Sequence, residues 1–428
     1  MEGVHNRELV FNVEGKEYVG LDLYRSRGGY EALKKVLAQD PRETIGVLKE
    51  SGLKGRGGAS FPTGLKIETV RDNREKERYI ICNADEGEPG TFKDRYIMTH
   101  LSFQLLEGIT IAAFLAGARH GIIYARHEYH EPQSVMRAAI AQAVAAGLLG
   151  DNILGSGFSL HLELFSGAGS YLCGEETALL SSIEGRKGRP QLKPPYPTQS
   201  GLWGRPTLIN NVETLANIPR IIAKGAGWYR QLGTEDSPGT KLISLSGDVE
   251  FRGLVEVPFG TTFRDIVYRY AGGPKPGRKV KAVNIGGASG VLIPEEMLDV
   301  PLEYGACSRS GITIGSGAVF VLDDTRSILD NVNNRVDFFL HESCGKCTPC
   351  REGLRQVQVI IKKLLNREAT VKDVQNLERY TRVMQSASFC GLGQAAGNSV
   401  ISSLHYYRDE YLNRCVDRKN VVYGEASA

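Results

Sequence analysis

Four cysteines near the C-terminus constrain this chain more than any other feature. Three are spaced three residues apart and one follows in a separate segment: Cys344, Cys347, Cys350 and Cys390. Each iron of a [4Fe–4S] cubane needs one external thiolate, so a triplet plus one distant cysteine predicts such a cluster. Lys346 and Arg351 lie among the cysteines and would offset part of the anionic charge. Four thiolates also suit zinc, but zinc sites usually bring cysteines in two separated pairs, so the spacing favours iron–sulfur over the zinc alternative.

Composition limits the remaining possibilities. The 428 residues are 41% hydrophobic and 24% charged with a net charge of +3, as in ordinary globular proteins, and we expect no nucleic-acid partner. Residues 1–10 lack a basic start followed by an apolar stretch, so we expect no signal peptide. The longest apolar run, Ile109–Ala118, is far shorter than the ~20 residues of a spanning helix, so we expect no direct membrane insertion.

The other four cysteines are scattered without a disulfide-like framework: Cys82, Cys173, Cys307 and Cys415. This usage is typical of a reducing compartment, and we interpret all of them except Cys173 as mostly buried, inert thiols.

Hydrophobic periodicity divides the chain into three parts. In residues 1–236, after an N-terminal extension, short apolar strands alternate with helices, which predicts a mostly parallel α/β sheet. Residues 237–328 predict a small β-grasp-like domain, and residues 329–428 a helical bundle that carries the cysteines. The expected helices are 30–38, 42–50, 101–118, 133–146, 262–270, 338–341, 354–365, 371–385 and 397–411. The expected strands are 79–83, 121–125, 241–246, 254–257, 280–285 and 318–322.

A glycine-rich loop, residues 55–64, runs directly into a predicted helix. Small residues let consecutive amides point at a phosphate, and the helix N-terminus adds partial positive charge. Arg56 and Lys66 could neutralise such an anion. The spacing is not that of a Walker A motif, and the loop does not strictly follow a strand, so a phosphate site and a plain turn stand as equal alternatives.

Acidic residues follow the first predicted strand directly, in the segment Asn83–Thr91. They are Asp85, Glu86 and Glu88. Ligands bind at the carboxyl ends of strands in such sheets, which favours a functional site over a solvated turn. Two later segments add candidates. Tyr171–Thr177 pairs a glycine with two carboxylates at a helix start, and Asn210–Thr214 offers amide and hydroxyl groups for a ring edge or a phosphate.

Taken in this order, the motifs resemble the NADH-binding flavoprotein subunits of bacterial respiratory complex I. The resemblance covers nearly the whole chain. It is carried by the segments Gly55–Lys66, Asn83–Asp94, Ser166–Thr177, Asn210–Thr214 and Cys344–Arg351. Diaphorase subunits of NAD-reducing hydrogenases and NAD-dependent formate dehydrogenases share these motifs. Many of them carry extra domains for which this chain has no room, so the complex I form is favoured and a diaphorase is the alternative.

The resemblance implies that FMN and NADH bind in a Rossmann-like first domain, that the second domain is a β-grasp (ubiquitin-like) fold, and that the bundle holds one [4Fe–4S] cluster on the four cysteines. The family's flavin contacts fall on Gly55, Gly57, Lys66, Asn83, Asp85, Gly87, Tyr171, Gly174, Glu175, Asn210, Asn211 and Thr214. Its NADH contacts fall on Phe61, Glu86, Glu88, Glu176, Lys193 and Tyr196. Ser60 and Ile67 depart from the usual Gly and Trp, and Ser60 would crowd the loop if its position needs a positive φ.

The implied activity is hydride transfer from NADH to FMN, followed by single-electron transfer to the cluster, with no side chain acting as acid or base. The implied partners are a thioredoxin-like [2Fe–2S] subunit and a large iron–sulfur subunit. The implied location is cytoplasmic and peripheral to the cell membrane. The alternative from a different class is a non-enzymatic iron–sulfur scaffold, which leaves the glycine-rich loop and the acidic segments unexplained.

Overall fold

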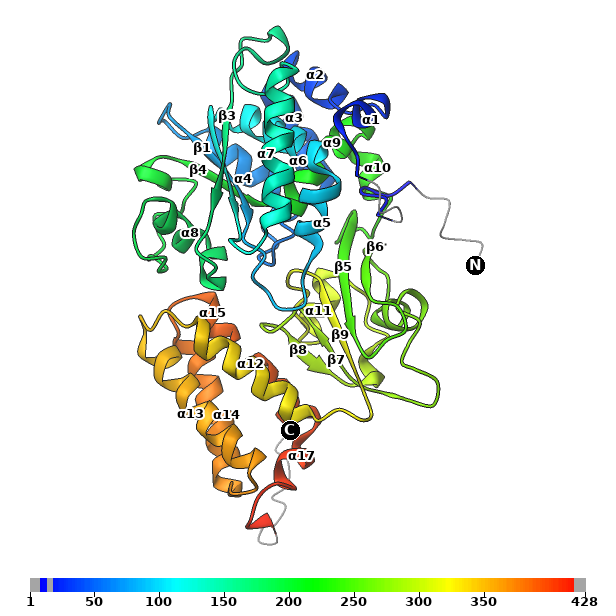
Figure 1. Ribbon diagram of the computed structural model, residues 1–428, viewed down its shortest axis with the longest axis vertical. Helices are drawn as coiled ribbons and strands as arrows, with labels where there is room; N and C mark the ends of the chain where they lie inside the picture. Colours follow the sequence, from blue (N-terminus) through cyan, green and yellow to red (C-terminus); the bar gives the residue numbers. More distant parts are fainter. Residues whose placement is uncertain (1–7, 14–17, 419–428) are drawn as a thin grey trace.

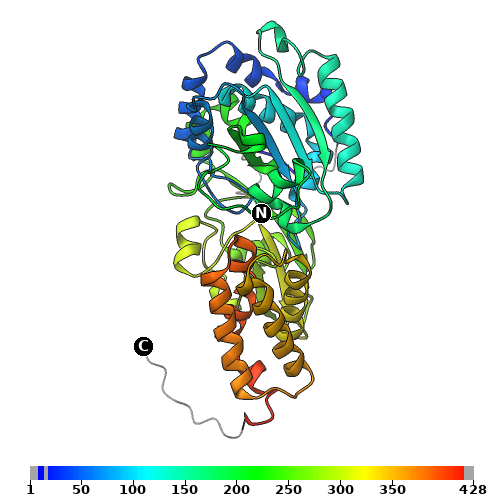
Figure 2. The same ribbon diagram turned by 90° about the vertical axis from the view of Figure 1, so that its left-hand side faces the viewer.

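The computed structural model describes residues 8–13 and 18–418. Within them, an α/β part lies at one end of the molecule, and a mixed sheet and a helical bundle lie side by side at the other (Figure 1). The view turned by 90° again shows the α/β part at one end, with the bundle in front of the mixed sheet at the other (Figure 2). The expectation for the start of the N-terminus, residues 1–7, falls outside the described residues.

A four-stranded parallel sheet in the order β3-β2-β1-β4 organises the α/β part. Its strands are β1 (Tyr79–Ala84), β2 (His120–Ala125), β3 (His161–Ser166) and β4 (Thr207–Asn211). Because β1 pairs with β2 on one side and with β4 on the other, the topological switch point of the sheet lies between β1 and β4. The predicted strands 79–83 and 121–125 are confirmed, whereas β3 and β4 were not predicted.

Successive residues of β1 face two different cores, as the twofold repeat of a strand requires. Ile80 and Cys82 pack into the larger core with the long helices, and Ile81 packs into a smaller core with α8. The helices of this part are α1 (Leu21–Ser26), α2 (Glu31–Leu37), α3 (Pro41–Ser51), α4 (Thr63–Arg71), α5 (Lys93–His100), α6 (Ser102–Ala116), α7 (His130–Ala145), α8 (Glu176–Ile183), α9 (Val212–Lys224) and α10 (Ala226–Arg230).

Helix α6 contains most of the longest apolar run and is buried along almost its whole length. Among the described residues, no single helix has the length and apolar character of a membrane span. Helices α5 and α6 satisfy the criterion only as a pair, and the chain bends by 98° between them.

The second sheet has the order β6-β5-β9-β7-β8, with β5 parallel to β9 and the other neighbours antiparallel. Its strands are β5 (Thr240–Gly247), β6 (Gly253–Pro258), β7 (Val280–Ile285), β8 (Val291–Ile293) and β9 (Ala318–Asp323). The helical segment η4 (Asp265–Tyr270), the short turn η5 (Glu295–Met297) and α11 (Tyr304–Arg309) connect the strands. The four predicted strands are confirmed, and β8 is an addition.

The bundle consists of α12 (Ile328–Glu342), α13 (Thr348–Leu365), α14 (Val371–Ala387), α15 (Gly391–Ala395), α16 (Asn398–Tyr406) and α17 (Arg408–Leu412). Two predicted helices were wrong in extent. The short helix at 338–341 is only the end of α12, which begins where the Ser327 side chain accepts a hydrogen bond from the Asp330 N–H. The single helix at 397–411 is two helices, because Tyr407 has non-helical dihedrals (φ −128°, ψ 32°).

Candidate functional site

The four predicted cysteine ligands line one small cavity of the helical bundle. Its other lining residues are Leu172, Pro190, Ser343, Lys346, Phe389 and Leu392. In the part of the chain that the structure describes, no three His, Cys, Asp or Glu side chains are arranged to hold a single metal ion. Four thiols around a closed, mostly apolar cavity are the donor set that an iron–sulfur cluster requires, so these residues fit the predicted group.

Two of the four cysteines precede helices. Cys347 comes directly before α13, whose N-terminal partial positive charge favours a thiolate, and Cys390 comes directly before α15. Burial raises the pKa of Cys390, an effect that the N–H groups of Gly393 and Leu392 oppose. Burial also raises the pKa of Cys350 to about 11. Cluster assembly must therefore displace a proton from Cys350 at neutral pH.

Close backbone approach fixes the cavity walls. A Cβ on Gly393 would lie 3.0 Å from the Cβ of Cys350, so only glycine leaves the two segments at this distance. Arg351 donates a 2.9 Å hydrogen bond to the carbonyl of Gly345 and holds the loop between the first two cysteines. Lys346 donates to the carbonyl of Pro190 at 2.6 Å, and its Nζ lies 4.1 Å from the centre of the Phe389 ring. Lys346 is therefore the cation that lines the cavity.

The predicted flavin residues of β1 and β4 meet at the carboxyl edge of the parallel sheet, beside its switch point. Asn83 donates to the carbonyl of Gly174 at 2.9 Å. Two buried atoms at this edge have no hydrogen-bond partner among the described residues: Oδ2 of Asp85, an acceptor, and Nδ2 of Asn210, a donor. Burial raises the pKa of Asp85 to about 7. An unpaired acceptor and an unpaired donor match the N–H and C=O groups on the pyrimidine edge of a flavin ring.

The glycine-rich loop lies against the end of β4. A Cβ on Gly57 would be 3.0 Å from the Cβ of Asn211, and the N–H of Arg56 donates to Thr214 Oγ1 at 2.8 Å. The N–H of Gly55 closes the loop on the carbonyl of Phe61 at 2.9 Å. The loop therefore brings its backbone to the same edge as the β1 and β4 residues.

Ser60 does occupy the left-handed region, with a φ of 56°. The position therefore needs the positive φ that glycine adopts without strain, and serine carries a conformational cost of about 1–2 kcal/mol there.

The interpretation of Arg56 as a counter-charge for a phosphate was wrong. Its guanidinium is buried and donates to the hydroxyls of Tyr304 on α11 at 2.6 Å and Tyr229 on α10 at 2.7 Å. It also lies 4.6 Å from the centre of the Phe259 ring. Arg56 is adjacent to the glycines in the sequence, but its three aromatic partners lie outside the loop and hold its charge away from a phosphate bound there.

Lys66 instead joins a group of predicted site residues from α8 and the loop that follows it. Its Nζ is 3.3 Å from Glu176, and Lys193 is 2.9 Å from Glu176 and 3.1 Å from Glu175. Glu175 also caps α8, because its carboxylate accepts the N–H groups of Thr177 and Ala178. The structure thus brings Lys66, Glu175, Glu176 and Lys193 together.

Two predicted nucleotide contacts, Phe61 and Tyr196, are aromatic side chains with exposed fractions of 50% and 52%. Rings this exposed are free to stack on a planar ligand.

The carboxylates of the acidic segment are held by the protein itself. Glu86 is buried and accepts the N–H groups of Asp94 at 2.9 Å and Arg95 at 3.0 Å, which caps α5. Glu88 accepts the Tyr171 hydroxyl at 2.7 Å and the N–H and hydroxyl of Ser289, each at 2.9 Å. Gly87 and Gly174 pack against Tyr171 and Asp85. Both carboxylates therefore stabilise the local fold, and their predicted contact with NADH stays a prediction.

A buried ionic network beneath this edge was missed by sequence analysis. Glu213, on α9, lies 3.1 Å from Lys93, forms an ion pair with Lys241 and accepts the N–H of Leu242 at 3.0 Å. Lys93 also pairs with Asp94 at 2.6 Å, and all four charged side chains are almost fully buried. Glu213 belongs to the Asn210–Thr214 segment that the sequence analysis selected. Its position among apolar residues could have indicated a buried carboxylate that needs charged partners.

Two adjacent residues join the two sites. Tyr171 belongs to the flavin group of predicted residues, packs on Phe338 with ring centres 5.2 Å apart, and donates its N–H to Glu342 at 3.0 Å. Leu172 lines the cysteine cavity. Helix α12, which carries Phe338 and Glu342, continues into the cysteine triplet. The flavin-type edge and the cysteine cavity are therefore neighbouring sites.

A ligand-binding edge on a parallel sheet beside a cavity of four cysteines defines an iron–sulfur flavoprotein. Known proteins agree with this class: the family model described as "Nuo51 FMN-binding domain" matches residues 48–220, and the one described as "NADH-ubiquinone oxidoreductase-F iron-sulfur binding region" matches residues 330–414. The chain belongs to the NADH-quinone oxidoreductase-F family of complex I proteins. It has an FMN-binding domain and a 4Fe–4S binding region, so both cofactor predictions are confirmed.

Relatives match along nearly the full length. An NADH-quinone oxidoreductase-F protein of Rhizobium meliloti is 44% identical over 412 residues, which cover 96% of this chain and 98% of the relative. The corresponding NADH-quinone oxidoreductase-F protein of Escherichia coli is 44% identical over 401 residues, covering 93% and 90%. Among solved structures, the NAD+-reducing [NiFe]-hydrogenase in its H2-reduced state matches with a TM-score of 0.85 and 38% identity, covering 94% of this chain and 67% of that chain.

Proposed function

We propose that this chain is the electron-input subunit of a respiratory NADH-quinone oxidoreductase, which oxidises NADH through FMN and passes single electrons to a [4Fe–4S] cluster. The observation that carries the proposal is the adjacency of the two sites: Tyr171 lies in one and Leu172 in the other. Bound FMN accepts a hydride and releases electrons one at a time, which is the chemistry needed between NADH and a one-electron cluster.

The proposed FMN contacts are Gly55, Gly57, Lys66, Asn83, Asp85, Gly87, Tyr171, Gly174, Glu175, Asn210, Asn211 and Thr214. Their support is the sheet edge shared by Asn83, Asp85, Asn210 and Asn211, together with the unpaired atoms of Asp85 and Asn210. The chain's own part in the reaction is to hold the reactants in register and to keep water from the buried edge. Asp85 and Asn210 would orient the ring, and the glycine-rich loop with Lys66 would hold the phosphate.

The proposed NADH contacts are Phe61, Glu86, Glu88, Glu176, Lys193 and Tyr196. Support comes from the half-exposed rings of Phe61 and Tyr196 and from the ion pair that Lys193 forms with Glu176. A carboxylate near the adenosine ribose would accept its hydroxyls and repel a 2′-phosphate, which favours NADH over NADPH.

The sheet orders support the finer fold assignments. The order β3-β2-β1-β4 is that of the first four strands of a Rossmann-type sheet. The second sheet places the parallel strand β9 between β5 and β7, with an antiparallel pair at each side, the arrangement proposed as a β-grasp fold. We place the domain boundaries at 1–236, 237–328 and 329–428.

The proposed partners are a thioredoxin-like [2Fe–2S] subunit and a large iron–sulfur subunit, and the proposed location is cytoplasmic, peripheral to the cell membrane. A second candidate is a diaphorase subunit of an NAD-reducing hydrogenase, because the solved hydrogenase matches 94% of this chain. Purification of the native complex separates the two: quinone reduction supports the respiratory enzyme, and hydrogen-dependent NAD+ reduction supports the diaphorase.

The enzymatic proposal is tested on the purified chain with FMN, using NADH as donor and ferricyanide as acceptor. We expect activity with FMN but not with FAD, because the glycine-rich loop offers one phosphate site. The activity should survive loss of the cluster, since ferricyanide can take electrons from reduced flavin. A chain that binds no FMN, or that oxidises NADH equally well with FAD, would contradict the proposal.

A further inference from the structure

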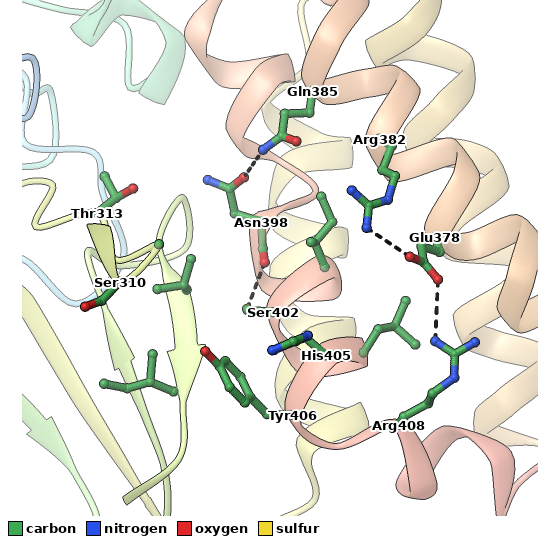
Figure 3. A pocket seen from close by; sticks show the side chains of 15 residues that line it. Ser310, Thr313, Glu378, Arg382, Gln385, Asn398, Ser402, His405, Tyr406 and Arg408 are labelled. Atoms are coloured by element: carbon green, nitrogen blue, oxygen red, sulfur yellow. Dashed lines mark hydrogen bonds and ion pairs between the residues drawn. The ribbon is translucent and has the colours of Figure 1, made fainter. Parts of the chain in front are cut away.

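A groove of about 500 Å³ runs between the mixed sheet and the bundle, and none of the predicted flavin or NADH contacts lines it. Figure 3 shows Ser310 and Thr313 on the sheet side, Glu378 and Arg382 of α14 on the opposite side, and α16 between them. No residue lines both this groove and the cysteine cavity. The groove is therefore separate from the chemistry described so far.

The charge of the groove is unbalanced. Glu378 is the sole carboxylate among its lining residues, and it is shared between Arg382 at 3.0 Å and Arg408 at 3.4 Å. Each guanidinium has five N–H donors, and one carboxylate cannot satisfy both groups. The groove thus keeps an excess positive charge and unspent donors. Figure 3 shows Arg382 and Arg408 on the same side of the groove, both joined to Glu378.

Further hydrogen-bonding groups line the opposite side and the floor. Ser310, Thr313 and Tyr406 have hydroxyl groups with no protein hydrogen-bond partner among the described residues, and the exposed ring of His405 packs edge-on against Tyr406. Asn398 and Ser402, by contrast, are engaged with Ser289 and Leu292. Because the Leu292 N–H of edge strand β8 is already bonded to Ser402, strand addition at that N–H is blocked, and a ligand must be recognised through side chains.

The groove continues onto the outer face of α14, since Glu378 and Arg382 also line the shallow depression formed with Arg379 and Val383. Val383 is 48% exposed. An apolar residue surrounded by arginines is typical of protein–protein contact surfaces, where Arg is enriched. From Glu378 to Gln385 the surface extends along α14 for about 10 Å at 1.5 Å per residue, enough for several residues of a partner.

We propose that this groove binds an acidic segment of another subunit of the complex. This proposal rests on the proposed function, because only a multisubunit enzyme has another subunit that can bind here. Aspartate and glutamate side chains of the segment pair with Arg382 and Arg408, and its polar backbone meets the free hydroxyls of Ser310, Thr313 and Tyr406. An open groove with exposed walls suits a protein segment better than a small molecule, which binds with most of its surface buried.

The test uses the complete complex, co-expressed and purified through a tag on this chain. The double variant Arg382→Glu and Arg408→Glu should lower the affinity for the partner subunits at least tenfold. The matched control is the double variant Arg355→Glu and Lys372→Glu, which reverses two exposed charges on α13 and α14 outside the groove. It should change the affinity for the partner subunits less than twofold. The variant Glu378→Gln, which removes the carboxylate that competes with the segment, should tighten binding severalfold. Unchanged partner affinity in the double variant would overturn the proposal.

A photo-crosslinking amino acid at Thr313 identifies the occupant independently of those variants. Mass spectrometry of the crosslinked complex should recover a peptide of a partner subunit with net negative charge. A neutral or basic peptide, or no protein crosslink, would overturn the proposal even if a charge-reversed variant failed to fold. NADH–ferricyanide activity of the isolated chain needs no partner, so its loss marks failure of the proposed function rather than of the docking site.

Discussion

Replacement of Glu213 by Gln tests whether the buried ionic network holds the flavin edge in place. Glu213 is fully buried and is the common partner of Lys93 and Lys241. It follows Asn210 and Asn211, the proposed flavin residues at the end of β4. The substitution keeps the size of the side chain and removes its charge, so Lys241 loses its carboxylate and Lys93 keeps only Asp94.

The magnitude follows from the burial of the partners. Removing one member of a buried ion pair costs about 3–5 kcal/mol, because the remaining charge is left uncompensated. The thermal midpoint of a unit of roughly 150–250 residues changes by about 2–4 °C per kcal/mol. The midpoint of the α/β part should therefore fall by at least about 6 °C. FMN should be released at the same lower temperature, because the network supports the flavin edge.

The loss should also depend on pH. Burial lowers the pKa of Lys241 from its ordinary value of 10.5 to about 8. The folded state therefore binds fewer protons than the unfolded state between about pH 8 and 10.5, and this lysine's contribution to the free energy of unfolding rises with pH across that window. In the variant, the absence of the Glu213 charge lowers the pKa of Lys241 further, so its free energy of unfolding begins to rise at a lower pH than that of the parent. The difference in free energy of unfolding between the two proteins should therefore shrink as the pH rises towards 8.

The assay is differential scanning calorimetry with flavin fluorescence between pH 6 and 9. Glu68→Gln is the matched control, because Glu68 makes an ion pair with Lys49 in a much more exposed place and should change the midpoint by less than about 2 °C. The double variant Glu213→Gln and Lys241→Met removes both charges and should recover part of the loss. A midpoint of Glu213→Gln within 1–2 °C of the parent, or a double variant no better than the single one, would refute the reasoning.

Three further outcomes are expected. Cys347→Ala should abolish the electron paramagnetic resonance signal of the cluster while FMN stays bound, and Cys415→Ala, outside the cavity, should leave the signal intact; a full signal without Cys347 would contradict the ligand assignment. Lys346→Met should lower the midpoint potential of the cluster, because a positive charge on the cavity wall favours the reduced, more negative state, and redox titration of the signal measures the shift. Glu88→Gln should raise NADPH oxidation at least tenfold with little change for NADH, and an unchanged preference in steady-state kinetics would remove Glu88 from nucleotide selection.

The sequence predicted the elements whose signal is local. Strands 79–83 and 121–125 are apolar on both faces, as central parallel strands are, and the structure confirms both. Strand β3 was missed because it is an edge strand with exposed His161 and Glu163 among its residues. Helix α9 was missed because it contains Pro219, which normally ends a helix, and because β4 runs into it without a loop.

In the candidate site, too, features that depend on a local sequence motif were predicted, and features that depend on tertiary contacts were not. The order of the motifs, with the compact cysteine triplet, was sufficient to predict both cofactors. The orientation of Arg56 and the partners of Glu213 depend on contacts between segments far apart in the sequence, and no local pattern specifies them. Glu86 and Glu88 are predicted NADH contacts, and the sequence did not indicate that the fold also supplies hydrogen-bond donors to both carboxylates.

The direct linkage of Tyr171 to Leu172 has a consequence for the kinetics of the protein. The peptide bond between them is planar and stiff, so the spacing of these two wall residues is set by covalent geometry and not by a hinge between separate bodies. Rocking of the bundle against the α/β part would instead change the distance from Leu172 to the cysteines, and the contacts of Tyr171 with Phe338 and Glu342 of α12 resist that movement. The rate at which charge passes between the two centres should consequently be insensitive to solvent viscosity, unlike the rates of redox proteins in which a mobile domain carries its cofactor from donor to acceptor.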